Sequence, residues 1–486
     1  MYVVMAASEA VPFAKTGGLA DVVGALPRAL KRLGVEVALI LPAYRSISGE
    51  RFGLQRTEWV LQVPVSHQTV SASVLRGELA PGIPVYFIEA DQYFARTDLY
   101  GTPDGDYLDN AERFAFFARA ILALLGHLGT PDVLHCHDWQ TALAPVFLRT
   151  DVARYPGLAD VRTVLTIHNI GYQGLFWHFD WHLLNIDWRY FTAEWLEFYG
   201  KINYLKGGIV CADAITTVSP TYAQEIQTPE LGYGLEGVLV ARRTALTGIL
   251  NGVDYSEWSP DRDRLIVAPF SADQLGGKAT CKADLQAAVG LPVDAKVPLI
   301  GIVSRLADQK GFDLLAEIAP QLLRKRVQLV ILGSGDLHHQ ELLLQLARQH
   351  KKRLAVRIAF DNTLAHKIEA GCDMFLMPSR YEPCGLNQIY SLRYGTIPVV
   401  RATGGLEDTI IDFEPQTRQG TGFKFVEYTG RALLSCIERA LSAYRTPAAW
   451  RTLMQNAMRA DFSWDRSAAA YAELYARLKG TRPAAG

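Results

Sequence analysis

The chain has 486 residues, too many for one ordinary hydrophobic core, so two domains are expected. Its 49 Lys and Arg residues nearly balance its 50 Asp and Glu residues, which argues against a nucleic-acid-binding or membrane-surface protein. The six cysteines form no Cys-x-x-Cys pair, no apolar run approaches the ~18 residues of a membrane-spanning helix, and the N-terminus lacks the basic segment of a signal peptide. A cytoplasmic protein is therefore expected.

The first half of the chain alternates short β-branched runs with helical patterns. Strands are predicted at residues 2–7, 35–41, 83–89, 133–137, 163–168 and 214–218, a strongly apolar helix at 112–128, and a loop at 98–109. Buried strands that alternate with helices are typical of a doubly wound parallel sheet, so the fold class is α/β.

The alternation breaks near residues 249–254, and residues 259–264 have the composition of a linker. It restarts with strands predicted at residues 299–303, 327–332, 356–360, 374–377 and 397–400 and a helix at 340–351. We predict a Rossmann-like domain at residues 1–250 and a second at 251–461. The tail forms a helix around residues 464–478, and we expect residues 462–486 to join the first domain.

Two nearly identical loops mark the two halves. The first, Lys-Thr-Gly-Gly-Leu-Ala-Asp-Val at residues 15–22, lies between a predicted strand and a helical pattern; the second, Thr-Gly-Gly-Leu-Glu-Asp-Thr-Ile, occupies residues 403–410. A strand, a Gly-Gly loop and a helix bring backbone N–H groups to a helix N-terminus, which suits an anion. Either loop alone is more simply a tight turn, but the pair, with the Lys15 cation attached, favours a phosphate-bearing ligand.

Further polar groups follow the predicted strands, where ligands of open α/β sheets bind. They are His137-Asp138-Trp139, His168-Asn169, Asn251, Ser304-Arg305, Lys310-Gly311, residues 333–336, residues 379–382 and residues 403–405. One such group is usually a helix cap or a turn, whereas so many at equivalent positions indicate a binding site. Residues 333–335 lack the third glycine of a dinucleotide-binding loop, which speaks against a Rossmann dehydrogenase.

Three of these positions carry distinct chemistry. Arg305 and Lys310 follow one strand and can neutralise a diphosphate; the alternative is a surface pair, which the turn at Gly311 disfavours. Glu382 precedes a helix expected to begin near Gly385, where its carboxylate can accept sugar hydroxyls, stabilise a developing cation or partner the helix terminus. The Asp-x-Asp strings at residues 104–106 and 261–263 lie away from the strand ends and are interpreted as turns, so no metal site is expected.

Taken together, the motifs resemble those of bacterial glycogen synthases and of the related plant starch synthases. They run from residue 3 to about residue 425 and comprise the Lys-Thr-Gly-Gly loop, His137-Asp138-Trp139, residues 166–169, residues 250–254, Ser304-Arg305 to Lys310-Gly311, residues 378–386 and residues 403–406. The resemblance implies two Rossmann-like domains that face across a cleft. It also implies transfer of glucose from ADP-glucose, with retention at the anomeric carbon, to the 4-hydroxyl at the non-reducing end of an α-1,4-glucan such as glycogen.

The resemblance also assigns roles by position, and no cofactor is expected. Donor phosphate and sugar contacts fall to Lys15 and Gly18, diphosphate contacts to Arg305 and Lys310, and the surroundings of the sugar to Asp138, His168, Asn251 and Glu382, with further contacts at Cys384, Gly385, Leu386, Thr403, Gly404 and Gly405. Glu382, His168, Asp138 and Lys15 form the implied catalytic set. Phe360 falls near the adenine, at a position where the family usually has Tyr, and Tyr390 stands where the wider superfamily has a second Glu.

A non-catalytic glucan-binding protein is the other alternative, and the complete set of Lys15, Arg305, Lys310 and Glu382 argues against it. The choice between ADP-glucose and UDP-glucose, the primer length and the oligomeric state stay open at this level.

Overall fold

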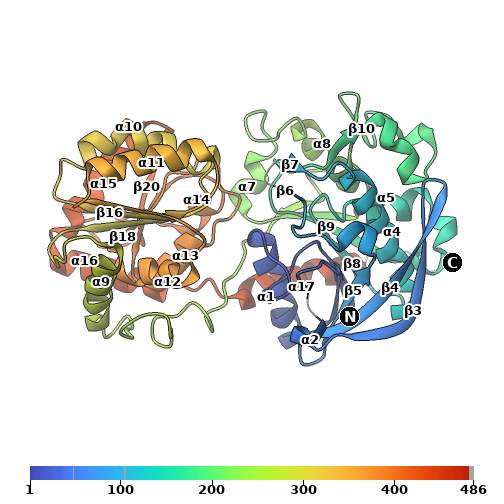
Figure 1. Ribbon diagram of the computed structural model, residues 1–486, viewed down its shortest axis with the longest axis horizontal. Helices are drawn as coiled ribbons and strands as arrows, with labels where there is room; N and C mark the ends of the chain where they lie inside the picture. Colours follow the sequence, from blue (N-terminus) through green and yellow to red (C-terminus); the bar gives the residue numbers. More distant parts are fainter. Residues whose placement is uncertain (48, 103–104, 481–486) are drawn as a thin grey trace. The chain divides into compact units, whose positions relative to one another are not determined.

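The computed structural model describes residues 1–47, 49–102 and 105–480. The chain divides into two compact units (Figure 1): unit 1 comprises Met1–Gly252 and the residues from Trp464 onward, and unit 2 comprises Val253–Ser463. Each unit is built on its own largely parallel sheet with helices packed on it, which confirms the α/β fold class.

The sheet of unit 1 has nine strands in the order β14-β13-β9-β8-β1-β2-β5-β4-β3. Their bounds are β1 Tyr2–Ala6, β2 Glu36–Pro42, β3 Gln55–Val65, β4 Gln68–Ala80, β5 Ile83–Glu89, β8 Val133–His137, β9 Arg162–Ile167, β13 Ala214–Thr217 and β14 Leu246–Gly248. The strands from β14 to β5 are parallel, and β1 pairs with β2 and β8 in the registers Met5↔Leu39 and Met5↔His135. Helices cover this part of the sheet on both faces, which is why β1 is apolar throughout and buried from Val3 to Ala6.

The helices of unit 1 are α1 Gly18–Arg32, α2 Gly49–Phe52, α3 Asp91–Phe94, α4 Asn110–Leu128, α5 Leu143–Thr150, α6 Tyr204–Cys211, α7 Pro220–Glu225, α8 Glu236–Ala241 and α17 Trp464–Gly480. The last of these returns the chain to unit 1: Ser467 Oγ donates to Leu250 O, and Tyr475 is fully buried. Two small sheets complete the unit, β10 Leu175–Trp177 with β12 Lys201–Asn203 and β11 Glu197–Phe198, and β6 Gly101–Thr102 with β7 Gly105–Asp106. The latter pair lies within the segment expected to be a loop, and Asp104 of the expected turn falls outside the described residues.

The sheet of unit 2 is parallel and has six strands in the order β17-β16-β15-β18-β19-β20. Their bounds are β15 Leu299–Val303, β16 Gln328–Gly333, β17 Leu354–Ile358, β18 Met374–Met377, β19 Ile397–Arg401 and β20 Phe423–Phe425. The helices are α9 Gly276–Val289, α10 Phe312–Leu322, α11 Leu337–Gln349, α12 Asn362–Gly371, α13 Asn387–Arg393, α14 Gly404–Thr409, α15 Gly430–Tyr444 and α16 Pro447–Arg459. Figure 1 shows α10 and α11 along one face of this sheet and α9 and α12 along the other.

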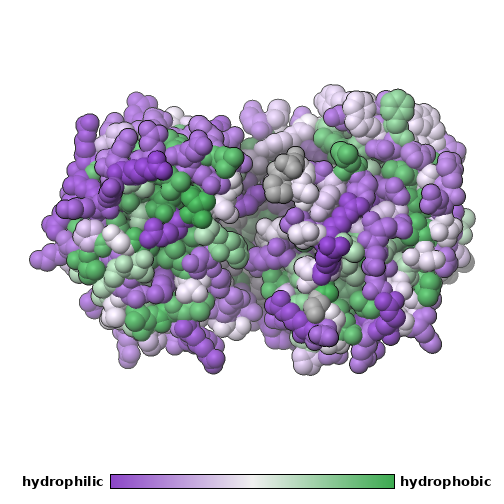
Figure 2. Space-filling model, viewed as in Figure 1, coloured by the Kyte–Doolittle hydropathy of each residue, from purple (hydrophilic) through white to green (hydrophobic). Residues whose placement is uncertain are grey.

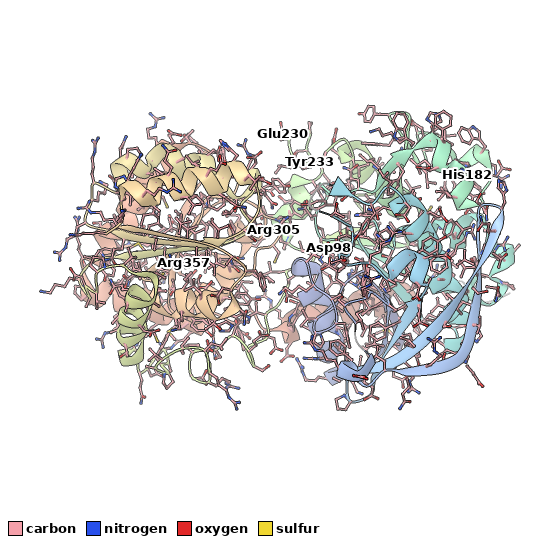
Figure 3. All side chains as sticks on the ribbon, in the orientation of Figure 1. Asp98, His182, Glu230, Tyr233, Arg305 and Arg357 are labelled. Carbon is pink, nitrogen blue, oxygen red and sulfur yellow. The ribbon has the colours of Figure 1, made fainter. Side chains whose placement is uncertain are left out.

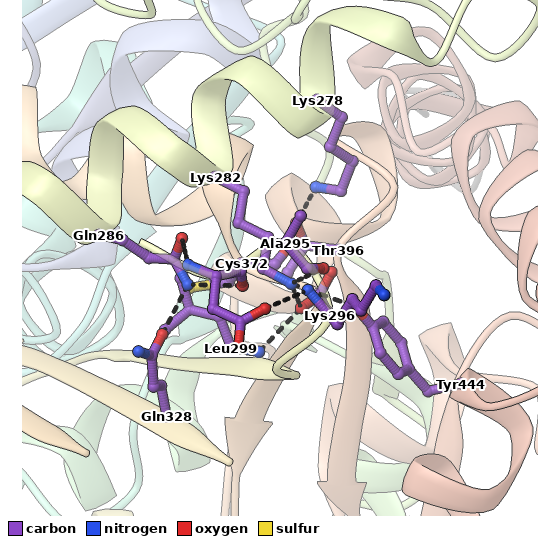
Figure 4. Close-up of polar contacts among 12 residues, drawn as sticks. Lys278, Lys282, Gln286, Ala295, Lys296, Leu299, Gln328, Cys372, Thr396 and Tyr444 are labelled. Carbon is purple, nitrogen blue, oxygen red and sulfur yellow. Dashed lines mark hydrogen bonds and ion pairs between the residues drawn. The ribbon is translucent and has the colours of Figure 1, made fainter. Parts of the chain in front are cut away.

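Two buried lysines anchor α9 to the sheet of unit 2 (Figure 4). Lys278 Nζ donates to Thr396 Oγ1 at 2.6 Å and to two backbone carbonyls, and Lys282 Nζ lies 2.7 Å from Asp373 Oδ2. Burial lowers the pKa of Lys278 to about 8. Each ammonium thus has partners that compensate for its lost hydration, as buried charges require.

On the face shown in Figure 2, hydrophilic residues ring each unit and hydrophobic residues are interspersed among them. Throughout the described part of the chain, the helices are too short or too polar to span a membrane.

Candidate active site

Both Thr-Gly-Gly loops lead from a strand into a helix, as predicted. The first follows β1 and opens α1, whose first residue is Gly18; the second follows β19 and opens α14, whose first residue is Gly404. Gly404 has a φ of +45°, and a Cβ there would lie 1.9 Å from Glu382 O. A side chain is therefore incompatible with the close approach of the loops after β18 and β19.

In unit 1 the predicted residues gather at the carboxyl ends of neighbouring strands. The Lys15 loop follows β1, Asp138 follows β8 and His168 follows β9, and these three strands are adjacent in the sheet. His168 N donates to Asp138 Oδ1 at 2.7 Å, so the structure joins these two residues directly. Asn251 follows β14 at the same edge and is buried, and its Oδ1 has no hydrogen-bond partner among the described residues.

The titrating groups of this cluster are shifted toward their neutral forms. Burial raises the pKa of Asp138 to about 7, opposed by the amides of His168 and Asn169 that donate to it. Burial lowers the pKa of His168 to about 3 and that of His137 well below its usual range. At neutral pH the site therefore offers uncharged imidazoles and a carboxyl group close to its titration midpoint, which suits sugar hydroxyls better than a free cation.

Lys15 does not contact this cluster directly. It is exposed and pairs with Asp21 of α1, with Lys15 Nζ 2.7 Å from Asp21 Oδ1. Its loop is held instead by Glu9, whose carboxylate accepts hydrogen bonds from Thr16 N, Thr16 Oγ1, Gly17 N and the Tyr100 hydroxyl. Glu9 was not predicted as a site residue. Its place just after β1 was the available signal.

In unit 2 the central contact joins Lys310 and Glu382. Lys310 follows β15 and Glu382 follows the adjacent β18, and Lys310 Nζ lies 2.6 Å from Glu382 Oε2. Ser379 Oγ donates to the same oxygen at 3.0 Å, and only 5% of Glu382 is exposed. A lysine ammonium has three N–H donors, of which Glu382 takes one, so Lys310 can serve the carboxylate and a ligand together.

The segment after Glu382 differs in one respect from the prediction. Helix α13 begins at Asn387 rather than near Gly385, because Gly385 has a φ of +69°, which ends any helical run there. Gly405 N donates to Glu382 O at 3.1 Å, so the second Thr-Gly-Gly loop is hydrogen-bonded to the Glu382 segment. Cys384 is buried, and Leu386 is the N-cap residue of α13.

Two other predicted residues are exposed at strand ends. Arg305 follows the carboxyl end of β15 (Figure 3), and Phe360 follows β17 with 87% of its surface exposed. The predicted strand at residues 356–360 in fact ends at Ile358. Thr403, by contrast, is buried as the N-cap residue of α14.

The described residues contain no cluster of three or more His, Cys, Asp or Glu that could hold a metal ion. Asp263, in one of the expected turns, accepts hydrogen bonds from Tyr394 and His366. The polar groups at the strand ends of unit 2 include lysine, arginine and a paired carboxylate, groups that suit a diphosphate joined to a sugar.

Comparison with known proteins identifies the relatives of the chain. The starch synthase catalytic domain family matches residues 2–241, and the glycosyl transferases group 1 family matches residues 288–455. The glycogen synthase of Koribacter versatilis is 54% identical over 482 residues, 99% of each chain, and that of Syntrophotalea carbinolica is 50% identical over 476 residues, 98% of each chain.

Among solved structures, the catalytic domain of starch synthase IV from Arabidopsis thaliana, bound to ADP and acarbose, superposes with a TM-score of 0.90 at 35% identity over 99% of each chain. Sucrose-phosphate synthase from Thermosynechococcus elongatus, 18% identical with a TM-score of 0.62 over 99% of this chain and all of its own, shares the fold. The architecture is that of a two-domain glycosyltransferase of the GT-B type. With half of its residues identical to those of glycogen synthases along its whole length, the chain belongs to the bacterial glycogen synthase family of glycosyltransferases.

Proposed function

We propose that this glycogen synthase transfers glucose from ADP-glucose to the non-reducing 4-hydroxyl of an α-1,4-glucan, with retention of the anomeric configuration and release of ADP. The observation that carries the proposal is the buried Lys310–Glu382 pair between two adjacent strand ends, beside a Thr-Gly-Gly helix start. A fixed ammonium near a helix N-terminus suits a diphosphate, and the carboxylate suits the attached sugar. The related starch synthase IV, which was solved with ADP and acarbose, supports the donor and the acceptor.

The donor contacts follow from these groups. Lys310, Arg305 and Lys15 neutralise the diphosphate, and the N-terminus of α14, which the second Thr-Gly-Gly loop opens, adds a favourable partial charge. Glu382 accepts glucosyl hydroxyls and stabilises positive charge that develops at the anomeric carbon. Gly18, a helix-start residue without a side chain, lets the donor approach the backbone of α1.

The surroundings of the sugar are assigned to unit 1. Asp138, His168 and Asn251 bind the glucosyl group and the incoming hydroxyl, and the unpartnered Asn251 Oδ1 is an acceptor available to a hydroxyl. Phe360 stacks beside the adenine without the hydroxyl that a tyrosine would supply.

Departure of ADP is stabilised by the protein itself. Three cationic side chains and two helix N-termini, each equivalent to about half a charge, oppose the charge of the leaving group. We therefore propose that the enzyme needs no metal ion or other cofactor. We also propose that it is cytoplasmic.

The decisive experiment measures ADP release from ADP-glucose with and without glycogen, with UDP-glucose as the competing donor. We expect glycogen-dependent release that is faster with ADP-glucose, and new linkages in the α configuration by proton NMR. Hydride transfer to a nicotinamide nucleotide, or glycogen binding without release of nucleotide, would refute the proposal. Faster release from UDP-glucose would refute the choice of donor alone.

A further inference from the structure

His168 lies against a second buried histidine. His168 Nε2 and His137 Nδ1 are 3.0 Å apart across the adjacent strands β9 and β8, and their ring centroids are 5.3 Å apart. Since burial keeps both imidazoles neutral, each ring carries one proton. One nitrogen of the pair must donate and the other accept.

The opposite side of His137 shows which nitrogen donates. His137 Nε2 is buried and has no hydrogen-bond partner among the described residues. The adjacent His135, with its ring centroid 4.2 Å away, cannot supply one, because its two nitrogens contact Tyr475 OH at 2.7 Å and Thr166 Oγ1 at 2.6 Å. A buried N–H group without an acceptor is rarer in proteins, and costs more free energy, than a buried acceptor without a donor. The unpartnered His137 Nε2 is therefore the nitrogen that carries no proton.

We infer that His137 donates its Nδ1 proton to His168 Nε2 and thereby fixes His168 as the tautomer protonated at Nδ1. His168 Nδ1 makes no hydrogen bond within the described chain and is not enclosed, and the residue as a whole is partly buried. The exposed edge of His168 is therefore an N–H donor. It binds a lone pair of a sugar oxygen and cannot accept a proton from a hydroxyl.

This inference rests on the proposed function for the identity of the ligand and gives His137 the role of a positioning residue. At the proposed sugar site, His168 is then a hydrogen-bond donor, whereas Asp138 and Asn251 supply acceptor oxygens. A ligand group that can only donate a hydrogen bond would leave the N–H at His168 Nδ1 without an acceptor. The site therefore favours a ligand oxygen with a lone pair directed at His168 Nδ1.

Long-range proton–nitrogen NMR of the full chain labelled with ¹⁵N-histidine tests the tautomer directly. The His168 signals are assigned as those that vanish in His168→Gln, a variant at a partly exposed position. We expect a protonated Nδ1 and an unprotonated Nε2. The reverse pattern, or a mixture of both tautomers, would overturn the inference even if the wild-type protein released ADP normally. If the wild-type protein showed the expected tautomer but released no ADP from ADP-glucose, only the proposed function would be refuted.

Two variants test the role of His137. His137→Asn keeps an N–H donor at the place of Nδ1, whereas His137→Leu removes it. We expect His137→Leu to lower kcat about tenfold, the scale of one hydrogen bond, and to give a mixture of His168 tautomers, and we expect His137→Asn to retain the Nδ1-protonated form and most of kcat. An unchanged His168 tautomer in folded His137→Leu would refute the assignment, and if that variant does not fold, the wild-type spectrum still decides it.

Discussion

Removing the Glu382 carboxylate tests the unit 2 site most directly. Glu382 Oε2 lies 2.6 Å from Lys310 Nζ and accepts the Ser379 hydroxyl, and Glu382 is almost fully buried. Glu382→Ala removes a preorganised electrostatic group from the place where charge develops, so turnover should fall by about 10²-fold or more, or about 2.7 kcal/mol of transition-state stabilisation. Glu382→Gln should lose a similar factor, because the amide carries no charge.

The same change has a calculable effect on stability. Removing one partner of a buried ion pair costs about 3–5 kcal/mol, since the other charge stays unpaired. The Lys310 side chain is 17% exposed, and water that reaches its ammonium relieves part of this penalty. We expect Glu382→Ala to lower the free energy of unfolding of unit 2 by about 2 kcal/mol and Glu382→Gln by less, because the amide oxygen still accepts hydrogen bonds.

Glu438→Ala is a matched control. Lys325 Nζ and Glu438 Oε1 are also 2.6 Å apart, but both side chains are substantially exposed. This variant should keep wild-type turnover and change stability by no more than about 1 kcal/mol. The assay is initial ADP release at saturating donor and glycogen, with urea unfolding of the same preparations. A folded Glu382→Ala variant with turnover within threefold of wild type would refute the role of the carboxylate.

Four further outcomes are expected. Lys15→Gln should raise KM for the donor with little effect on glucan affinity, and equal losses for both substrates in steady-state kinetics would show that Lys15 shapes the whole site. Gly404→Ala should lower the free energy of unfolding by more than about 2 kcal/mol in urea titrations, because its Cβ would overlap Glu382 O, whereas Gly18→Ala, with nothing within 4 Å, should unfold like wild type. Burial raises the pKa of Glu369 from 4.5 to about 8. Between these pH values the carboxyl is ionised in the unfolded chain but protonated in the folded protein, so the free-energy cost of folding rises with pH from about 4.5 to 8. Glu369→Gln removes this cost and should stabilise the protein by about 3 kcal/mol more at pH 8 than at pH 5, and a pH-independent effect would contradict the shift. Activity should be retained in the presence of EDTA. If EDTA abolished activity and added magnesium or manganese restored it, the proposal that cationic side chains alone stabilise the diphosphate would be refuted.

The sequence predicted the elements better than the contacts between them. The strand at residues 83–89 and that at 299–303 have the predicted bounds, because apolar β-branched runs bounded by turns mark buried parallel strands. The hairpin of β3 and β4 was not predicted, although its alternating exposure is typical of an antiparallel edge. Such a pattern is easily missed in a chain whose other strands are apolar throughout.

The site residues were found by position, whereas their partners depend on strand order. Placing polar residues at strand ends located Lys310 and Glu382, but their contact exists because β15 and β18 are neighbours although 72 residues separate the pair. Nothing in the local sequence specifies that adjacency. The role of Glu9 and the tautomer of His168 likewise depend on which side chains meet across strands.

The two lysines of the proposed diphosphate site differ in a way that only their partners reveal. Lys15 pairs with Asp21 at a partly exposed position, where an ion pair contributes about 0–1 kcal/mol and is easily exchanged for another anion. Lys310 is held by a buried carboxylate whose charge would otherwise be unpaired, so it stays in place whether or not a ligand is bound. A diphosphate can therefore draw Lys15 away from Asp21 at little cost and meets Lys310 already oriented. Loss of Lys15 should accordingly weaken donor binding, whereas loss of Lys310 should also release Glu382 from the geometry that the transfer step requires.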